Sequence, residues 1–206
     1  MSTLLVIAKA PAPGRVKTRL TPRFTPEEAA GLARAALQDT LAAVLATDAR
    51  RRVLVLDGQP GPWLPEGIEV VPQCAGGLDV RLAAAFSLSG GPALLIGMDT
   101  PQVTPELLAQ GLDFTGTRAW FGPADDGGFW ALGMARPDPA LLVGVPMSVP
   151  HTGREQRLRL TASGRAVRDL PALCDVDTPA DAARVAAAAP GTRFAALHGE
   201  LCAVAR

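Results

Sequence analysis

The chain has 206 residues, of which 48% are hydrophobic and 19% are charged, and its 20 basic residues balance 20 acidic ones. This composition excludes a disordered chain, and a net charge of zero disfavours nucleic acid as the main partner. No run of about 18 apolar residues occurs, so we expect no membrane-spanning segment. Three widely spaced cysteines indicate a reducing, cytoplasmic environment without a disulfide framework.

In the first part of the chain, apolar runs alternate with helix signals. Residues 4–8 predict a buried first strand, and residues 52–57 and 68–71 predict two more. Between them, Thr25-Pro26-Glu27-Glu28 has the pattern of a capping box, and the apolar residues after it recur at helical spacing. A glycine-containing loop then leads into a second helix that ends near Leu88.

The middle of the chain contains the clearest strand signal. Residues 93–97, ALLIG, are uninterrupted apolar residues and predict a central parallel strand that is buried on both faces. A helix start follows at Thr104. Residues 118–122 and 129–134 predict two strands, and the short loop between them makes the second one antiparallel to its neighbour.

The last part of the chain predicts less regular structure. We expect a short helix or turn at residues 137–143, a helix at residues 153–163 and a last strand at residues 165–170. A further helix begins after Thr178, which can cap it, and the tail from residue 192 to residue 206 is weakly patterned.

The alternation of strands and helices predicts the fold class. We expect an α/β protein of three layers, with a mostly parallel central sheet between helices. Residues 1–206 show no internal repeat or linker, and a chain of this length can bury a good core, so we expect a single domain.

A basic loop follows the first predicted strand, from Lys9 to Leu20, KAPAPGRVKTRL, and no acidic residue precedes Glu27. Its cations are Lys9, Arg15, Lys17 and Arg19. A cationic loop at the carboxyl end of a strand in an open sheet predicts a phosphate site. The alternatives are a solvated basic loop or a non-specific RNA contact. The loop contains neither a Walker motif nor a G-x-G-x-x-G fingerprint.

Acidic residues lie where other predicted elements begin or end. Asp99 directly follows the central strand, so it should face the same crevice as the basic loop and could hold a phosphate-bound Mg²⁺. Its alternative role is that of an ordinary turn residue. Asp177 precedes a helix that Thr178 can cap, which leaves the acid free for another role, although a helix-start acid is the simpler interpretation.

Two further segments predict contacts to a substrate. Asp125-Asp126-Gly127-Gly128 is first of all a turn sequence, but Asp126 could bind a hydroxyl group or act as a general base. Ser148 is a polar residue in an irregular, proline-flanked loop and could contact a substrate.

Four stretches together resemble one protein family. They are KAPAPGRVKTRL at residues 9–20, GMDTPQVTP at residues 97–105, PADDGGFW at residues 123–130 and DVDTPAD at residues 175–181. This combination resembles small bacterial transferases described as glycosyltransferase-like or radical-SAM/selenodomain-associated, and the likeness covers about residues 3–185. They belong to the nucleotide-diphospho-sugar transferase superfamily, which implies the glycosyltransferase A fold. The opening loop also resembles that of 2-phospholactate guanylyltransferase, and the DTP turns resemble those of molybdenum-cofactor guanylyltransferase.

The resemblance implies roles for individual residues. Asp99 and Asp177 would be ligands of Mg²⁺ or Mn²⁺, and Gln73 would lie near the base. The residues implied around the nucleotide phosphates are Lys9, Arg15, Lys17, Thr18 and Arg19. The residues implied in catalysis are Asp99, Lys17 and Asp126. The residues expected at the substrate are Asp126, Gly127, Gly128, Phe129 and Ser148. One departure is that G-G-L-D-V-R follows Gln73 where the family has a pattern like G-D-L-G-E-R.

These observations predict a metal-dependent transferase that uses a nucleotide-activated donor and a small-molecule acceptor. The leading interpretation is a glycosyltransferase-like enzyme that uses a nucleotide sugar. The alternative is a nucleotidyltransferase that acts on a phosphorylated acceptor and releases pyrophosphate. A non-catalytic nucleotide-binding module is the remote alternative. The base, the sugar, the acceptor and the oligomeric state stay open at this point.

Overall fold

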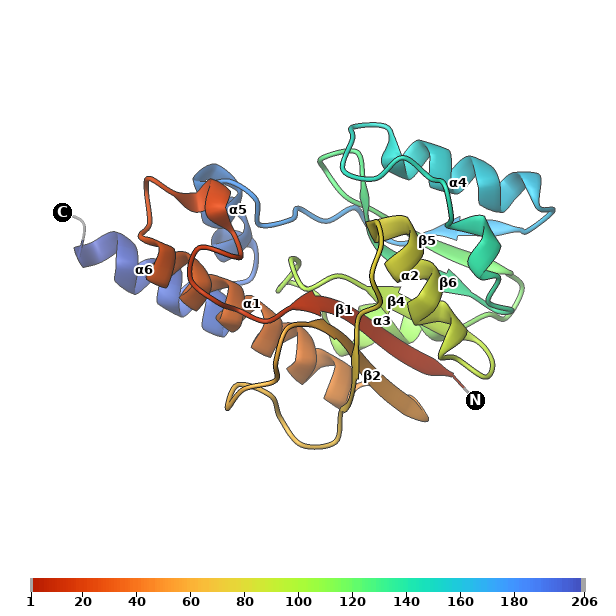
Figure 1. The fold of residues 1–206 in the computed structure, drawn as a ribbon, viewed down its shortest axis with the longest axis horizontal. Helices are drawn as coiled ribbons and strands as arrows, with labels where there is room; N and C mark the ends of the chain where they lie inside the picture. The colour runs from red at the N-terminus through yellow and green to blue at the C-terminus, as the bar shows by residue number, and fades with distance from the viewer. Residues whose placement is uncertain (1, 205–206) are drawn as a thin grey trace.

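The computed structural model describes residues 2–204, which contain a seven-stranded sheet covered by helices (Figure 1). The strands are β1 (Thr3–Lys9), β2 (Arg51–Asp57), β3 (Glu69–Pro72), β4 (Ala93–Ile96), β5 (Ala119–Pro123), β6 (Phe129–Met134) and β7 (Val167–Asp169). The α-helices are α1 (Pro26–Ala46), α2 (Leu78–Ser87), α3 (Pro105–Leu112), α4 (Thr152–Ala162), α5 (Pro179–Ala188) and α6 (Arg193–Val204). Two short 3₁₀ helices are η1 (Thr18–Leu20) and η2 (Pro139–Leu141).

The sheet has the strand order β3-β2-β1-β4-β6-β5-β7. Every neighbouring pair is parallel except those that involve β6, which is antiparallel to both β4 and β5. The predicted mostly parallel sheet with an antiparallel strand at residues 129–134 is therefore confirmed. Because β6 runs the other way, its first residues lie at the same edge of the sheet as the last residues of β1 and β4.

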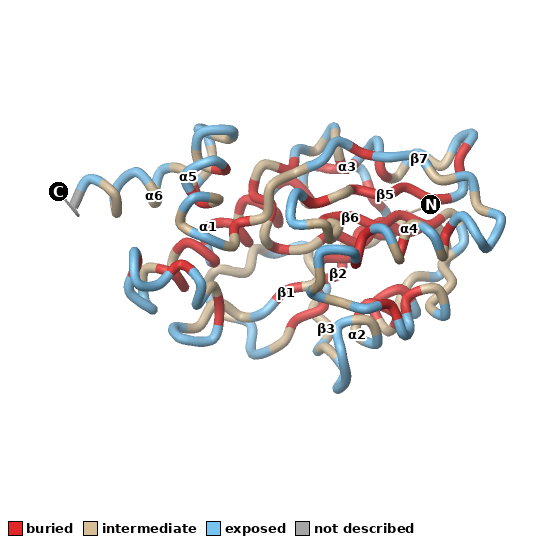
Figure 2. The backbone as a smooth tube through the Cα atoms, turned by 90° about the horizontal axis from the view of Figure 1, so that it is seen from above, coloured by how far each residue is buried: buried red, intermediate tan, exposed pale blue. Residues whose placement is uncertain are grey.

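Alternate residues of the buried strands face two different apolar clusters. Leu4 and Val6 of β1 pack with α1 and α3 on one face, and Leu5 packs with α2 and α4 on the other. All three side chains are fully buried, as expected for a central strand covered on both faces. The buried stretches of the tube in Figure 2 run through the sheet between these helices, so the predicted three layers are confirmed.

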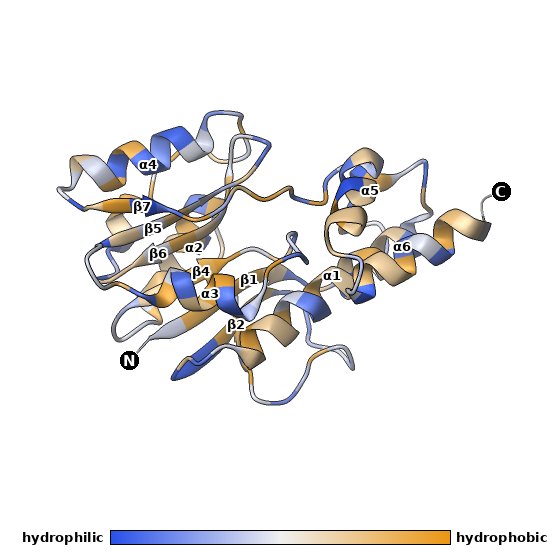
Figure 3. Cartoon of the chain, turned by 180° about the vertical axis from the view of Figure 1, so that it is seen from behind, coloured by the Kyte–Doolittle hydropathy of each residue, from blue (hydrophilic) through white to orange (hydrophobic). Residues whose placement is uncertain are grey.

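A third apolar cluster lies beyond the sheet, between η1, α1, α5 and α6. We call the part formed by η1, the first half of α1, α5 and α6 the helical lobe, and it lies to one side of the sheet (Figures 1 and 3). Phe194 is fully buried in this cluster and Leu197 packs against it. The backbone N–H groups of Arg193 and Phe194 both donate to the carboxylate of Asp39 on α1. Residues 193–204 of the tail therefore form an ordered helix, which the weak sequence pattern did not predict, and residues 205–206 lie outside the described part of the chain.

Other predicted boundaries need small corrections. The last strand covers only residues 167–169 rather than 165–170, and the turn region at residues 137–143 contains only the 3₁₀ helix η2. The capping box at Thr25 is confirmed, because Thr25 accepts from the Glu28 N–H while Glu28 accepts from the Thr25 N–H. Within residues 2–204, the helices are all too short or too polar to cross a lipid bilayer.

Candidate functional site

A crevice of about 670 Å³ opens at the carboxyl-terminal edge of β1 and β4. One wall is the loop after β1, and another is the start of α2 with Gln73. The opposite wall comes from the β5–β6 turn, the segment 147–152 and the acids that precede α5. Every predicted site residue lines this crevice except Gly127, so residues from distant parts of the sequence meet at one edge of the sheet.

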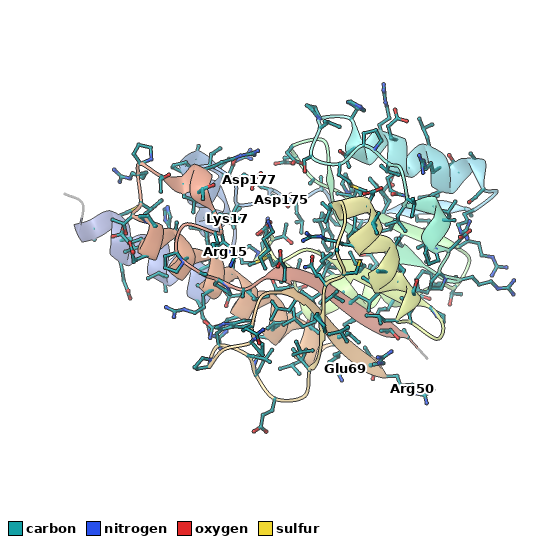
Figure 4. The ribbon with its side chains drawn as sticks, viewed as in Figure 1. Arg15, Lys17, Arg50, Glu69, Asp175 and Asp177 are labelled. Atoms are coloured by element: carbon teal, nitrogen blue, oxygen red, sulfur yellow. The ribbon has the colours of Figure 1, made fainter. Side chains whose placement is uncertain are left out.

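Lys17 lies at the centre of the crevice. Its ammonium nitrogen is 2.8 Å from Asp99 Oδ1 and 3.3 Å from Asp177 Oδ1, and 8% of its side chain is exposed. Burial by itself lowers the pKa of Lys17, but the ion pairs with Asp99 and Asp177 outweigh burial and raise the pKa above its usual value. The charged ammonium thus joins the loop after β1 to two acids that are distant in sequence. Figure 4 shows one of these acids, Asp177, beside Lys17.

The basic loop is anchored by the apolar residues on either side of Lys17. Val16 and Leu20 are 7% and 0% exposed and belong to two different clusters, one under the sheet and one in the helical lobe. Lys17 has a φ of +49°, in the left-handed region that non-glycine residues seldom adopt. Such a conformation costs about 1–3 kcal/mol, so the surrounding packing must hold it. The loop therefore directs the Lys17 side chain into the crevice.

Two hydrogen bonds fix the segment before α5 against the turn after β4. The Val176 N–H donates to the Asp99 carbonyl at 2.9 Å, and Gln102 Nε2 donates to the Cys174 carbonyl at 2.7 Å. Val176 is 1% exposed and packs in the third cluster. Its neighbours Asp175 and Asp177 both line the crevice, so one buried valine places both acids.

Asp177 does not cap α5. Thr178 is the cap, because its hydroxyl accepts from the Asp181 N–H while Asp181 accepts from the Thr178 N–H. The predicted cap is thus confirmed, and Asp177 instead contacts Lys17 and Arg19, the latter at 3.5 Å. The side chains of Asp99 and Asp177 are 40% and 34% exposed, so both carboxylates remain open to a ligand.

Asp175 is a site residue that sequence reasoning missed. We interpreted it only as an acid before a helix, but it lies between the crevice and a smaller cavity behind it. Burial, and then the nearby charges of Asp99 and Asp126, raise its pKa to about 7. The alternation of acid, valine and acid at residues 175–177 was the available signal, since burial of the central valine directs both neighbours away from the core.

The β5–β6 turn presents Asp126 and Gly128 to the crevice and uses Gly127 to pack. Asp126 Oδ1 accepts from the Gly128 N–H at 2.8 Å, which leaves its second oxygen available. Gly127 has a φ of +87°, and a Cβ there would lie 2.0 Å from the Pro150 carbonyl oxygen. Gly127 therefore lies at the contact between the turn and the segment before α4. Phe129 lines the crevice itself.

Ser148 lies on a loop that closes on itself. The Thr152 hydroxyl accepts from the Val149 N–H at 3.2 Å and donates to the Pro146 carbonyl at 2.7 Å. Ser148 has a φ of +59°, the second left-handed non-glycine residue of the described chain after Lys17. Both of these strained residues line the crevice.

Gln73 is held by the sheet. Its Nε2 donates to the carbonyls of Ala8 at 2.8 Å and Val55 at 3.1 Å, and its Oε1 accepts from Arg81 Nη1 at 3.2 Å. The same Arg81 nitrogen also pairs with Asp57 at 3.2 Å. The amide hydrogens of Gln73 are thus committed to the backbone, and Arg81, which sequence reasoning did not select, lines the crevice beside it.

Asp99 and Asp177 suit a divalent cation. Their Oδ1 atoms lie no more than about 6 Å apart because both contact the same nitrogen, and small rotations would bring both onto one Mg²⁺, whose ligands lie about 2.1 Å away. Oxygen ligands favour Mg²⁺ and Mn²⁺. Among residues 2–204, no three acidic, histidine or cysteine side chains gather into a complete metal centre.

Comparison with known proteins places the chain in a family. The model of the family described as "Uncharacterized protein conserved in bacteria (DUF2064)" matches residues 31–149. The chain belongs to this family. One relative that matches nearly the whole chain is phosphoenolpyruvate guanylyltransferase of Streptomyces avermitilis. It is 36% identical over 214 residues, which cover 97% of this chain and 94% of the relative.

Solved structures share the fold of this family member. A candidate nucleotide-diphospho-sugar transferase of Desulfovibrio desulfuricans G20 is 26% identical and superimposes with a TM-score of 0.88, covering 98% of this chain and 95% of that one. Rv0371c of Mycobacterium tuberculosis H37Rv, in complex with manganese, is 22% identical with a TM-score of 0.50, covering 89% and 97%. The fold is that of nucleotide-diphospho-sugar transferases, the glycosyltransferase A type. The protein is a transferase of the nucleotidyl or nucleotide-sugar kind.

Proposed function

We propose that this transferase is a nucleotidyltransferase, which moves a nucleoside monophosphate from a nucleoside triphosphate to a small phosphorylated acceptor and releases pyrophosphate. The observation that carries the proposal is the buried Lys17 ammonium, which stands 2.8 Å from Asp99 at the point where the basic loop meets the acids. The full-length similarity to a guanylyltransferase supports guanosine as the base. We therefore take GTP as the first donor and phosphoenolpyruvate as the first acceptor to test.

The charge of the basic loop favours a triphosphate donor. Its four cations all line the crevice, namely Lys9, Arg15, Lys17 and Arg19. A nucleoside triphosphate carries more negative charge than the diphosphate of a nucleotide sugar, so it gains more from this concentration of cations. Arg15 and Arg19 are exposed, so they can turn toward a ligand without breaking buried contacts.

We propose that Asp99 and Asp177 are the residues that hold Mg²⁺ or Mn²⁺. When bound, the ion supplies positive charge to the donor phosphates. The acidic, half-exposed pair fits such an ion, and the manganese in the Rv0371c complex is consistent with this choice. Asp175 also lines the crevice, and the charge of Asp99 contributes to its raised pKa.

The residues of this chain would act mainly by position and charge. In the transfer, an oxygen of the acceptor phosphate bonds to the α-phosphorus of the donor while the bond to pyrophosphate breaks. No general base is required, because the acceptor phosphate is already ionised. Lys17 stabilises the charge on the transferred group, since its ammonium is preplaced in a site with little water. Asp126, Gly128, Phe129 and Ser148 form the acceptor wall opposite the basic loop.

Glycosyl transfer is the second candidate, and the candidate nucleotide-diphospho-sugar transferase of D. desulfuricans, with its TM-score of 0.88, favours it. In that reaction the free oxygen of Asp126 would activate an acceptor hydroxyl, and a nucleoside diphosphate would leave. The two reactions share the donor phosphates and the acid pair, so the leaving group separates them.

Mass spectrometry of the products decides between the two. The protein is incubated with each nucleoside triphosphate or with nucleotide sugars, with Mg²⁺ or Mn²⁺, and with phosphoenolpyruvate or other small phosphorylated acceptors. We expect acceptor-dependent release of pyrophosphate, strongest with GTP. Omission of the acceptor and addition of a metal chelator are the controls. Release of nucleoside diphosphate from a nucleotide sugar, without pyrophosphate from any triphosphate, would show the proposal to be wrong.

A further inference from the structure

Lys17 occupies the position that a divalent ion would need in order to contact Asp99 and Asp177 together. Its nitrogen is 2.8 Å from one carboxylate and 3.3 Å from the other. These are the two acids that fit a metal ion, and both are oriented toward the same point. An ammonium and a divalent ion cannot occupy that point together, because two cations at contact distance repel each other strongly in a partly buried site.

The ammonium is built into this position by the fold. The side chain of Lys17 is 8% exposed, whereas those of Asp99 and Asp177 are 40% and 34% exposed. Val16 and Leu20 anchor the loop in two different cores, and the left-handed backbone of Lys17 lies between them. A flexible surface lysine would not need such support. The fold therefore places a cation between the two acids.

The negative charges around the crevice explain why a cation is needed there. Four carboxylates line it, those of Asp99, Asp126, Asp175 and Asp177. Without Lys17 these acids would repel one another and the phosphates of an incoming donor. When a metal–nucleotide complex enters, the metal can take the carboxylates, while the phosphates offer the ammonium new partners at the same place.

We propose that Lys17 is a resident cation that exchanges partners on ligand binding. It holds Asp99 and Asp177 in the free protein and transfers to the donor phosphates when a divalent ion takes the two acids. This inference rests on the proposed metal and nucleotide site, but it concerns the order of events rather than the reaction. It implies that the metal alone binds weakly, since it must displace a buried ammonium, and that metal and nucleotide assist each other.

Opposite effects of one substitution test this exchange. In Lys17→Met, the affinity for Mn²⁺ without nucleotide should rise about tenfold, because the competing ammonium is gone. The affinity for GTP without a divalent ion should fall by a similar factor, because a phosphate partner is lost. Mn²⁺ binding is measured by electron paramagnetic resonance of the free ion, and GTP binding by calorimetry in the presence of a chelator. An ordinary structural lysine would not shift the two affinities in opposite directions.

Three further variants serve as controls. Arg15→Met removes a crevice cation for which the described structure records no ion pair with either acid. It should therefore weaken GTP binding and leave the affinity for Mn²⁺ unchanged. Lys17→Arg keeps the charge and should keep Mn²⁺ binding weak. Asp99→Asn added to Lys17→Met should remove the gained Mn²⁺ affinity. Lys17→Gln replaces Lys17→Met if thermal melting shows that the methionine variant is unfolded.

The outcomes separate this inference from the proposed function. Unchanged or weaker Mn²⁺ binding in Lys17→Met and Lys17→Gln would overturn the exchange, and so would a gain that survives Asp99→Asn. Absence of pyrophosphate release with every triphosphate, while the opposite shifts in Mn²⁺ and GTP affinity are observed, would overturn nucleotidyl transfer but leave the exchange in place.

Discussion

At the scale of single residues, the crevice depends on charged side chains whose environments differ. Lys17 is buried and keeps its charge through its two acids, whereas Asp99 is 40% exposed and can be reached by ligands. Asp175 is held at a pKa of about 7 by burial and by the charges around it. Groups with strongly perturbed pKa values cluster at functional sites.

Asp99→Asn should separate function from stability. The substitution keeps the shape of the side chain but removes the charge that faces Lys17, so we expect acceptor-dependent pyrophosphate release to fall by about 100-fold or more. The free energy of unfolding should change by less than about 1 kcal/mol, because the carboxylate is partly solvated. Steady-state kinetics and urea unfolding give the two quantities.

The matched control is Asp169→Asn on β7, which breaks an exposed ion pair with Arg157 of α4, away from the crevice. It should change stability by a similarly small amount and leave the rate unchanged. Full activity in Asp99→Asn would remove Asp99 from the catalytic site.

At the scale of elements, the start of α5 divides its duties between neighbouring residues. Thr178 and Asp181 satisfy the first N–H groups of the helix, and Asp177 faces the crevice. Thr178→Ala should therefore lower the free energy of unfolding by about 1 kcal/mol, because a capping bond is lost. Asp177→Asn should lower the free energy of unfolding much less, and it should weaken Mn²⁺ binding in the presence of GTP. Equal stability losses in urea unfolding would show that Asp177 is part of the cap.

The sequence predicted elements whose signals are local, and it missed features that depend on distant contacts. The basic loop and Asp99 were selected together because strands of a parallel sheet end at one edge, and the structure brings them within an ion pair. Asp175 was missed because only the burial of Val176 in the helical lobe distinguishes it from an ordinary helix-start acid. The bonds of Gln73 go to carbonyls 65 and 18 residues away, which no local pattern reveals.

The helix α6 was missed for a related reason. Thr192 caps it locally by accepting from the Ala195 N–H, but the N–H groups of Arg193 and Phe194 donate to Asp39 of α1. Sequence patterns describe caps and periodicity within one segment. They do not describe a carboxylate supplied by another helix, so the contribution of Asp39 to α6 could not be predicted from the tail itself.

At the scale of the whole molecule, the crevice lies between parts that have separate apolar cores. Asp99 follows a strand of the sheet, whereas Val176 and the acids around it are anchored in the helical lobe. Loosening the lobe should therefore disturb the proposed metal-binding pair, even though none of the lobe's buried core residues lines the crevice. Core substitutions in the helical lobe and beneath the sheet can perturb the two sides of the crevice separately.

Phe194→Leu and Phe86→Leu provide that comparison, because both phenylalanines are fully buried, one in the helical lobe and one beneath the sheet. Each should reduce the free energy of unfolding by about 1.5 kcal/mol or less. Only Phe194→Leu should weaken Mn²⁺ binding measured with GTP by electron paramagnetic resonance, under conditions where both variants are folded. Equal weakening in the two variants would contradict a separate role for the lobe.

The reversed direction of β6 bears on how the substrate range of this family can diversify. A hairpin turn brings Asp126 and Gly128 of the proposed acceptor wall to the crevice, while the basic loop and Asp99 follow parallel strands whose connections include helices. Insertions or exchanges in a short turn disturb few other contacts, whereas changes in a crossover displace a whole helix. Descendants of one ancestral gene can thus acquire new acceptors by altering the turn and inherit an unchanged donor site.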